Sequence, residues 1–257
     1  MQVLEIGEIP LGFPTGKHVH PSMGSIFHGA LMELLAPEQA AFFHEQGMRP
    51  YSQAVFWDDV RKQAVWRLGV LDAMTAAIIF PVLEKMESIT LRQQGYAVSL
   101  GKVRRQSFSA GDADPMQEET PTGAVIHFLT TTSFKRNGVH VLFPEPELLY
   151  QSVLQRWPLI SGMPMEPGIH QILSYYTIIQ DYDLHTGSFQ LEGHYVKGFS
   201  GMLCLRFGGG RQVQQLAGML LQCGNAAGFG VKTALGMGAS QVQIQYKKRV
   251  HTQRRKG

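Results

Sequence analysis

The chain has 257 residues, of which 44% are apolar and 17% are charged. This composition is typical of a globular protein and excludes a fibrous or largely disordered chain. The sequence has no run of about 18 apolar residues, which a membrane-spanning helix needs, and its N-terminus lacks the basic and apolar regions of an export signal. The length allows one large or two small domains.

The positive charge is concentrated at the C-terminus. The net charge is +3, and six lysines and arginines lie among the last eleven residues, so the rest of the chain carries about −3. This is a near-neutral body with a basic tail (residues 251–257), unlike a uniformly basic protein that coats nucleic acid. The two cysteines, Cys204 and Cys223, lack the spacing of a zinc or redox motif, so we expect a reduced, cytoplasmic protein.

Hydrophobic periodicity predicts the order strand, helix, two strands, helix and further strands in the first half of the chain. These elements are a strand at 1–11, a helix at 25–35, strands at 52–57 and 64–68, a helix at 71–86 and strand pairs within 88–106. The segment 111–123, which is acidic and rich in glycine and proline, is typical of a linker.

The second half repeats this order. Its predicted elements are a strand at 124–135, a helix at 145–157, strands around 170–180 and 193–206, a helix at 211–223 and a strand at 239–249. Each half therefore follows the βαββαβ order of a ferredoxin-like unit. We predict an α+β protein with two tandem ferredoxin-like (RRM-like) domains, at 1–110 and 124–250.

A glycine-rich loop joins the last predicted helix to the last strand, with the sequence GFGVKTALGMG around Lys232. Its glycines are Gly228, Gly230, Gly236 and Gly238. Such a loop can aim N–H groups at a phosphate, to which the lysine adds a positive charge. A Walker loop needs the opposite order of flanking elements, and a dinucleotide fingerprint needs glycine where Thr233 stands. A plain connection that packs a helix closely against a strand explains the glycines equally well.

Three segments resemble one family in the same order along the chain. The glycine loop has the form G-h-G-x5-G-h-G, where h is apolar. Residues 27–35 with 41–45 resemble the first helix and its following segment, and residues 132–146 resemble the start of the second domain. The family is that of the CRISPR repeat-processing endoribonucleases of the RAMP superfamily. The resemblance implies cleavage of repeat RNA without a metal or other cofactor, in which a 2′-OH attacks the adjacent phosphorus and leaves a 2′,3′-cyclic phosphate and a 5′-OH.

The resemblance assigns proton transfer to His44, which matches the family's catalytic histidine. Histidine suits this role because its ordinary pKa is close to 6.5. Met32 stands near the position of a tyrosine that some relatives carry, and Arg49 stands near that of a lysine. Arg49 can stabilise charge on the phosphorane, but it is a poor proton donor at neutral pH. His28 and Tyr51 are alternative proton-transfer residues.

Further basic residues are candidates for RNA contacts. Lys232, together with the four loop glycines, is the first candidate for a phosphate contact, followed by Lys135 and Arg136. His18 and His20 are spaced like a pair of metal ligands, but no cysteine or carboxylate cluster accompanies them. We therefore interpret them as loop residues near the RNA, with no metal site.

Three functions are compatible with these features. The first is the repeat-processing endoribonuclease, as a monomer or homodimer whose partner is repeat RNA and its product, crRNA, and which has no membrane association. The second is a non-catalytic RAMP subunit that binds RNA among the subunits of a CRISPR effector complex. The third is a small-molecule-binding protein of ferredoxin-like fold, which leaves the three matching segments unexplained. His44 favours the first.

Overall fold

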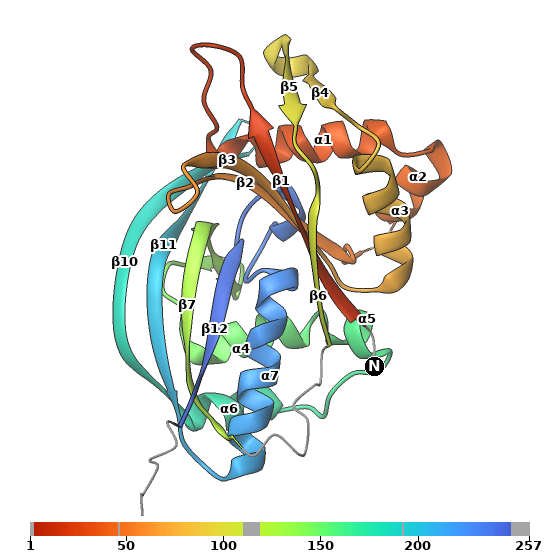
Figure 1. Cartoon of the computed structure of the whole chain (residues 1–257). Coiled ribbons are helices and arrows are strands. Elements are labelled where there is room, and N and C mark those ends of the chain that lie inside the picture. Colours follow the sequence, from red (N-terminus) through yellow and green to blue (C-terminus); the bar gives the residue numbers. More distant parts are fainter. Residues whose placement is uncertain (1–2, 46, 110–118, 192, 248–257) are drawn as a thin grey trace, which may run out of the picture.

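The computed structural model describes residues 3–45, 47–109, 119–191 and 193–247. Two antiparallel sheets follow one another along the chain, and helices accompany each sheet (Figure 1). Most of the predicted linker and the predicted basic tail lie outside the described residues.

The first sheet is built around β1, which lies between β3 and β6. Its strands are β1 (Val3–Gly12), β2 (Tyr51–Asp58), β3 (Gln63–Val70), β4 (Ser88–Leu91), β5 (Tyr96–Leu100) and β6 (Arg104–Ser109). The order β2–β3–β1–β6 forms its main part, and β5 pairs with the end of β1 and with β4. The helical segments are η1 (Pro21–Met23), α1 (Gly24–Leu34), α2 (Pro37–Glu45), α3 (Ala73–Leu83) and η2 (Arg92–Gln94).

The second sheet has the order β10–β11–β7–β12. Its strands are β7 (Pro121–Thr132), β10 (Thr177–Leu191), β11 (His194–Phe207) and β12 (Ser240–Tyr246), and a separate hairpin contains β8 (Phe134–Arg136) and β9 (Val139–Val141). The helical segments are α4 (Pro146–Leu154), α5 (Trp157–Ser161), α6 (Ile169–Tyr175), α7 (Arg211–Ala227) and η3 (Thr233–Leu235). In both sheets the second, third, first and fourth strands of a βαββαβ unit lie side by side, so the predicted tandem ferredoxin-like fold is confirmed.

Three local predictions differ from the structure. The strand predicted around 170–180 is wrong in its first part, because residues 169–175 form α6 and β10 begins at Thr177. Ile169 and Leu173, four residues apart, both pack on the second core, which is helical spacing. The helix α2 and the β8–β9 hairpin were not predicted. Asn137 and Gly138, both at positive φ, form the hairpin turn and are its sequence signal.

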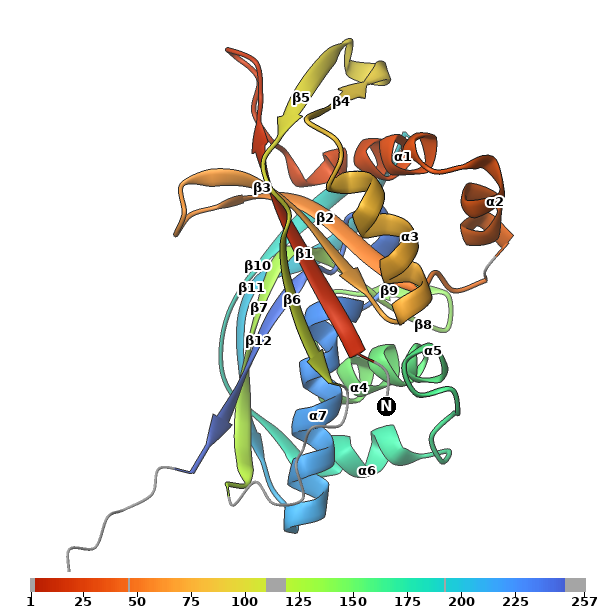
Figure 2. The same ribbon diagram turned by 45° about the vertical axis from the view of Figure 1, so that its right-hand side comes forward.

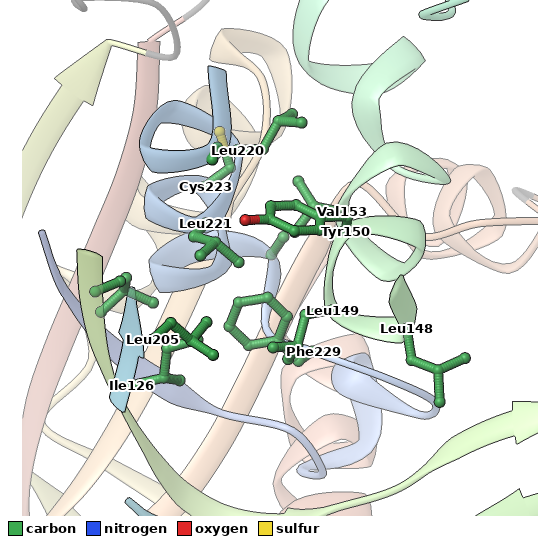
Figure 3. Packing of buried hydrophobic residues seen from close by; sticks show 14 of the residues in the cluster. Ile126, Leu148, Leu149, Tyr150, Val153, Leu205, Leu220, Leu221, Cys223 and Phe229 are labelled. Atoms are coloured by element: carbon green, nitrogen blue, oxygen red, sulfur yellow. The ribbon is translucent and has the colours of Figure 1, made fainter. Parts of the chain in front are cut away.

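The two units share buried surface. The core of the second unit consists of side chains from α4, α7 and its sheet, together with Phe229 of the glycine loop (Figure 3). Leu4, Ile6 and Leu71 of the first unit belong to the same cluster. The C-terminal end of α7 lies against the first sheet, where Ser52 Oγ donates to the Ala226 carbonyl oxygen at 2.6 Å. This packing fixes the start of the glycine loop beside the first unit (Figure 2).

The glycine loop contacts the N-terminal end of α1. Gly24 lies directly against the loop backbone, and an added Cβ would stand 2.5 Å from the Leu235 carbonyl oxygen and 2.6 Å from Gly236 Cα. The side-chain amide of Gln53, which is buried on β2, donates to the carbonyl oxygens of Gly24 at 2.8 Å and of Ala234 at 2.9 Å. The loop of the second unit is thereby held one helical turn before His28 of the first.

Replacing Gly24 by alanine should push the glycine loop away from the N-terminal end of α1. Because the colliding atoms are backbone atoms, the loop has to shift, and the expected loss in free energy of unfolding is about 1–3 kcal/mol. Gly29→Ala in the same helix is the matched control, since Gly29 is exposed and has no atom within 4 Å of an added Cβ. It should stabilise the protein by about 0.5–1 kcal/mol. Urea unfolding measures both variants, and equal effects would contradict the close packing.

Candidate active site

Four of the candidate catalytic side chains lie together in the first unit. They are His28 on α1, His44 on α2, Arg49 in the following connection and Tyr51 at the start of β2. The ring centroids of His28 and His44 are 6.4 Å apart, and those of His28 and Tyr51 are 6.2 Å apart. The structure therefore groups residues that the sequence places as many as 23 positions apart.

Apolar anchors orient the two histidines. Phe27, which precedes His28, is fully buried and contacts the Trp66 ring edge-on at 5.1 Å between centroids. Phe43, which precedes His44, is also fully buried and packs against the Tyr51 ring at 5.2 Å. Neighbouring residues of a helix point in different directions. His44 points away from its buried neighbour and is exposed, whereas His28 lies against Tyr51 and is only 7% exposed.

His28 and Tyr51 form a buried pair. The Tyr51 hydroxyl and His28 Nδ1 share a hydrogen bond of 3.2 Å, and the hydroxyl lies 4.0 Å from the Met32 sulfur. Burial, together with the electrostatic effect of Arg49 and, to a smaller extent, of His44, lowers the pKa of His28 to about 4. Burial also raises the pKa of Tyr51 well above its ordinary value of 10. At neutral pH both side chains are uncharged, which suits them to holding the site in place.

This arrangement makes the stability of the protein depend on pH. Between pH 6.5 and about 4 the unfolded chain protonates His28 while the folded chain leaves it neutral, so stability falls as the pH falls through this window. The full contribution is on the order of 3 kcal/mol. His28→Gln should remove this part of the pH dependence in urea unfolding between pH 7 and 4. The difference in unfolding free energy between the wild type and His28→Gln, followed against pH, reports the contribution of His28 alone. If the two proteins had the same pH dependence, His28 would not be held neutral in the folded state.

Arg49 carries an unsatisfied donor into this group. Its Nε is the only buried side-chain nitrogen or oxygen without a hydrogen-bond partner among the described residues. A buried donor normally has a partner. Arg49 is half-buried; its charge lowers the pKa of His28 and offsets part of the rise that burial causes in the pKa of Tyr51. The guanidinium is therefore a candidate for binding an anion at the site.

The N–H groups of three loop glycines donate to other parts of the protein, whereas the sequence led us to expect them to face outward. Gly228 donates to the Gly224 carbonyl oxygen at 2.9 Å, Gly230 to Ser152 Oγ at 2.7 Å and Gly238 to the Thr131 carbonyl oxygen at 3.1 Å. Cβ atoms at Gly230 and Gly238 would collide with the carbonyl oxygens of Ser133 and Phe229. The glycines thus allow close packing, which was the alternative interpretation of the loop.

Lys232 is the exposed cation of the loop. Its backbone is in the left-handed region, with φ of 58°, and its side chain is exposed. Arg156, which directly precedes α5, supports the loop by donating to the Gly230 carbonyl oxygen at 3.1 Å and to Thr233 Oγ1 at 3.0 Å. The sequence interpretation missed Arg156 and Gln53, whose signal is a polar residue among apolar neighbours.

The remaining candidate residues lie in two other places. Lys135 lines a cavity of about 100 Å³ together with Gly230, so it joins the loop surface. Arg136 is paired with Glu145 at 2.6 Å, which compensates its charge. His18 and His20 lie in the segment after β1, where His20 Nδ1 accepts the Ser22 N–H at 3.2 Å and caps η1.

Among the described residues, no group of three or more histidine, cysteine or acidic side chains is arranged to hold a metal ion. The helices of the described ranges also lack the combination of length and apolarity that crossing a membrane requires.

Comparisons with known proteins point to one family. A sequence profile described as CRISPR-associated endoribonuclease Cas6 matches residues 126–240. The Cas6 endoribonuclease of Streptococcus thermophilus is 30% identical over 235 residues, which cover 90% of this chain and 96% of that protein. The Cas6 endoribonuclease of Mycobacterium tuberculosis is 25% identical over 227 residues, covering 86% and 72%.

Solved structures of similar fold agree with this match. A Cas6 product complex has a TM-score of 0.78 at 22% identity, covering 94% of this chain and 99% of that one. Thermus thermophilus Cas6 has a TM-score of 0.72 at 21% identity, covering 95% and 99%. The structures support the fold, and the sequence match to the streptococcal protein extends over nearly the full length of both chains. The protein thus belongs to the Cas6 family of CRISPR-associated endoribonucleases.

Proposed function

We propose that this protein cleaves CRISPR repeat RNA without a metal ion and thereby matures crRNA. The observation that carries the proposal is the exposed His44 beside Arg49, His28 and Tyr51, next to the docked glycine loop. Family membership supports the endoribonuclease activity. Similar solved structures are described as Cas6 product and substrate mimic complexes, and another as a RAMP protein that binds different RNA substrates.

In the proposed reaction the 2′-oxygen upstream of the scissile bond attacks the adjacent phosphorus. The new bond closes the 2′,3′-cyclic phosphate, and the bond from phosphorus to the 5′-oxygen breaks. The 2′-OH loses its proton to a base, and the departing 5′-oxygen gains one to become a 5′-OH. His44 carries out one of these proton transfers, because it is the exposed histidine of the group. The other transfer uses solvent water in this proposal.

The other three side chains support His44 in different ways. Arg49 is placed to stabilise the negative charge of the pentacoordinate phosphorus. His28 changes its proposed role, since burial and a pKa of about 4 make it a poor proton donor at neutral pH. It holds Tyr51, and through Phe43 the pair supports the helix that carries His44. Lys232 and Lys135 contact RNA phosphates from the loop surface.

The chemistry can be tested with one substrate pair. In EDTA, the protein should cut repeat RNA from its own host once per repeat and leave a cyclic phosphate on the upstream fragment. A single 2′-deoxy substitution immediately upstream of the cut should abolish cleavage, because the nucleophile is missing, and should preserve binding. Product fragments are measured by gel electrophoresis and mass spectrometry. Cleavage that requires Mg²⁺, or that survives the deoxy substitution, would exclude this mechanism. Binding without cleavage would favour a non-catalytic RNA-binding subunit.

A further inference from the structure

A second cavity lies at the end of the first sheet. It has a volume of about 570 Å³ and is lined by the segment after β1 and by residues on both sides of the β2–β3 turn. Both segments project from the same end of the sheet (Figure 2). The residues that matter below are Phe13, Lys17, His18, Trp57, Lys62 and Gln63.

The cavity opens on the sheet face that also carries the candidate active site. Trp57 pairs with Ala64 of β3, and Ala64 pairs with Leu11 of β1, so the three residues form one row on one face. Tyr51 lies on the same face, six residues before Trp57 along β2, which corresponds to about 20 Å. Phe56 is on the opposite face, where it packs beside Leu129 of the second sheet. The cavity is therefore separate from the space between the two sheets.

The wall of the cavity suits an aromatic ring. Trp57 is 51% exposed, whereas Trp66 on β3 is fully buried. The small side chain of Ala64 beside Trp57 leaves space over the sheet, and Phe13 adds a second partly buried ring. Flat aromatic surfaces of this kind stack with any nucleobase.

The rim of the cavity suits an anionic backbone. Lys17, His18 and Lys62 line it, and none of the described residues that line it is acidic. Asp59 lies 3.5 Å from Lys62 Nζ, but both side chains are at least 74% exposed, so this pair contributes little. Gln63 and His18 offer hydrogen bonds to a base edge. Positive charge around an exposed aromatic ring is the chemistry of single-stranded nucleic-acid binding.

Hydrogen bonds within the protein hold both segments that line the cavity in place before any ligand binds. The Asp58 carboxylate accepts the N–H groups of Val60 and Arg61 at 2.9 Å each, which fixes the turn after Trp57. On the other side, Lys17 N–H donates to the Pro14 carbonyl oxygen at 3.0 Å, and Lys17 Nζ lies 5.4 Å above the centre of the Tyr96 ring. A site that is already ordered loses less entropy on binding.

We propose that this cavity binds one unpaired base of the repeat RNA, stacked on Trp57, while Lys17 and Lys62 contact the flanking phosphates. This inference rests on the proposed function, since it assumes that repeat RNA is the substrate. A base inside a double helix has its faces covered by its neighbours, so the occupant is a base outside the paired stem.

The experiment combines removal of single RNA bases with removal of the Trp57 ring. Repeat RNAs with a single abasic site at each position are bound to the wild type, to Trp57→Ala and to the control Tyr195→Ala, an exposed aromatic residue outside the cavity. At one unpaired position, base removal should weaken RNA binding by the wild type and by the control about 5- to 150-fold. The same base removal should not weaken RNA binding by Trp57→Ala, which already lacks the stacking partner. Trp57→Phe should restore most of the effect.

Each outcome has a defined meaning. Equal losses for the wild type and Trp57→Ala at every position, or a coupled position inside the stem, would overturn the proposal. Cleavage of the unmodified RNA by the wild type is measured in parallel, so its absence reports failure of the proposed function separately. The Lys17→Gln and Lys62→Gln double variant leaves the Trp57 ring in place. The slope of log K for RNA binding against log salt concentration should become shallower by about 1.4 in this variant, because two phosphate contacts are lost. An unchanged slope would show that Lys17 and Lys62 do not contact the RNA phosphates.

Discussion

Replacing His44 by alanine should slow cleavage of repeat RNA by about 100- to 10,000-fold. His44 is the exposed member of its group, and the His28 ring lies 6.4 Å behind it. Removal of the imidazole therefore eliminates a proton transfer without opening the core. The dissociation constant of the RNA should change little, because the phosphate contacts remain. Single-turnover kinetics with saturating protein measures the effect on the chemical step.

The neighbouring Glu45 supplies the control for this variant. Glu45 is also exposed on α2, and Glu45→Ala should keep cleavage near the wild-type rate. Added imidazole should restore part of the activity of His44→Ala, since it can enter the space left by the side chain. A fully active His44→Ala would show that another group transfers the proton, and the proposed assignment would then be wrong.

Replacing Arg49 by alanine should reduce the cleavage rate by about 100- to 1,000-fold, the usual effect of losing one donor that stabilises transition-state charge. Its buried Nε has no hydrogen-bond partner in the part of the chain that the structure describes, and its charge acts on both His28 and Tyr51. Arg49→Lys should recover only part of the rate, because lysine keeps the charge but not the planar fork of donors. The rate constant at saturating protein should fall more than the affinity.

The surface residue Arg92 provides the comparison for Arg49. Arg92 is 76% exposed and pairs with Glu33 at 3.2 Å, so Arg92→Ala should have almost no effect on cleavage. Thermal unfolding of both variants separates a catalytic effect from a structural one. If Arg49→Ala cleaved normally, or lost activity only in proportion to lost stability, stabilisation of the phosphorane by Arg49 would be excluded.

Local patterns in the sequence were sufficient for most of the architecture. The short runs of mostly buried residues in β2 and β3 are typical of strands, and the helical spacing of apolar residues in α1 and α7 is typical of helices. The duplicated order of elements then led to two ferredoxin-like units. Prediction failed where a short element buries few residues, as in α2 with its single buried Phe43, or where a helix precedes a strand directly, as at α6.

The sequence named the side chains that the structure groups in the candidate site, but it did not indicate how their environments differ. The sequence by itself indicated His44, Arg49, His28 and Lys232, because family motifs are local in the chain. Only the tertiary structure decided which of them reach the surface. Burial of His28 against Tyr51 depends on the packing of three separate elements, and it is this desolvation that lowers the pKa of His28.

The same division applies to the glycine loop and to Trp57. The sequence determined that residues 228–238 form a loop of positive-φ glycines around one lysine. Contacts with Ser152 and Thr131, far away in the chain, decided that the N–H groups of Gly230 and Gly238 point inward. Trp57 reads as one more apolar strand residue until the position of the segment after β1 is known. A side chain's environment is set by neighbours that are distant in sequence, and only folding brings them together.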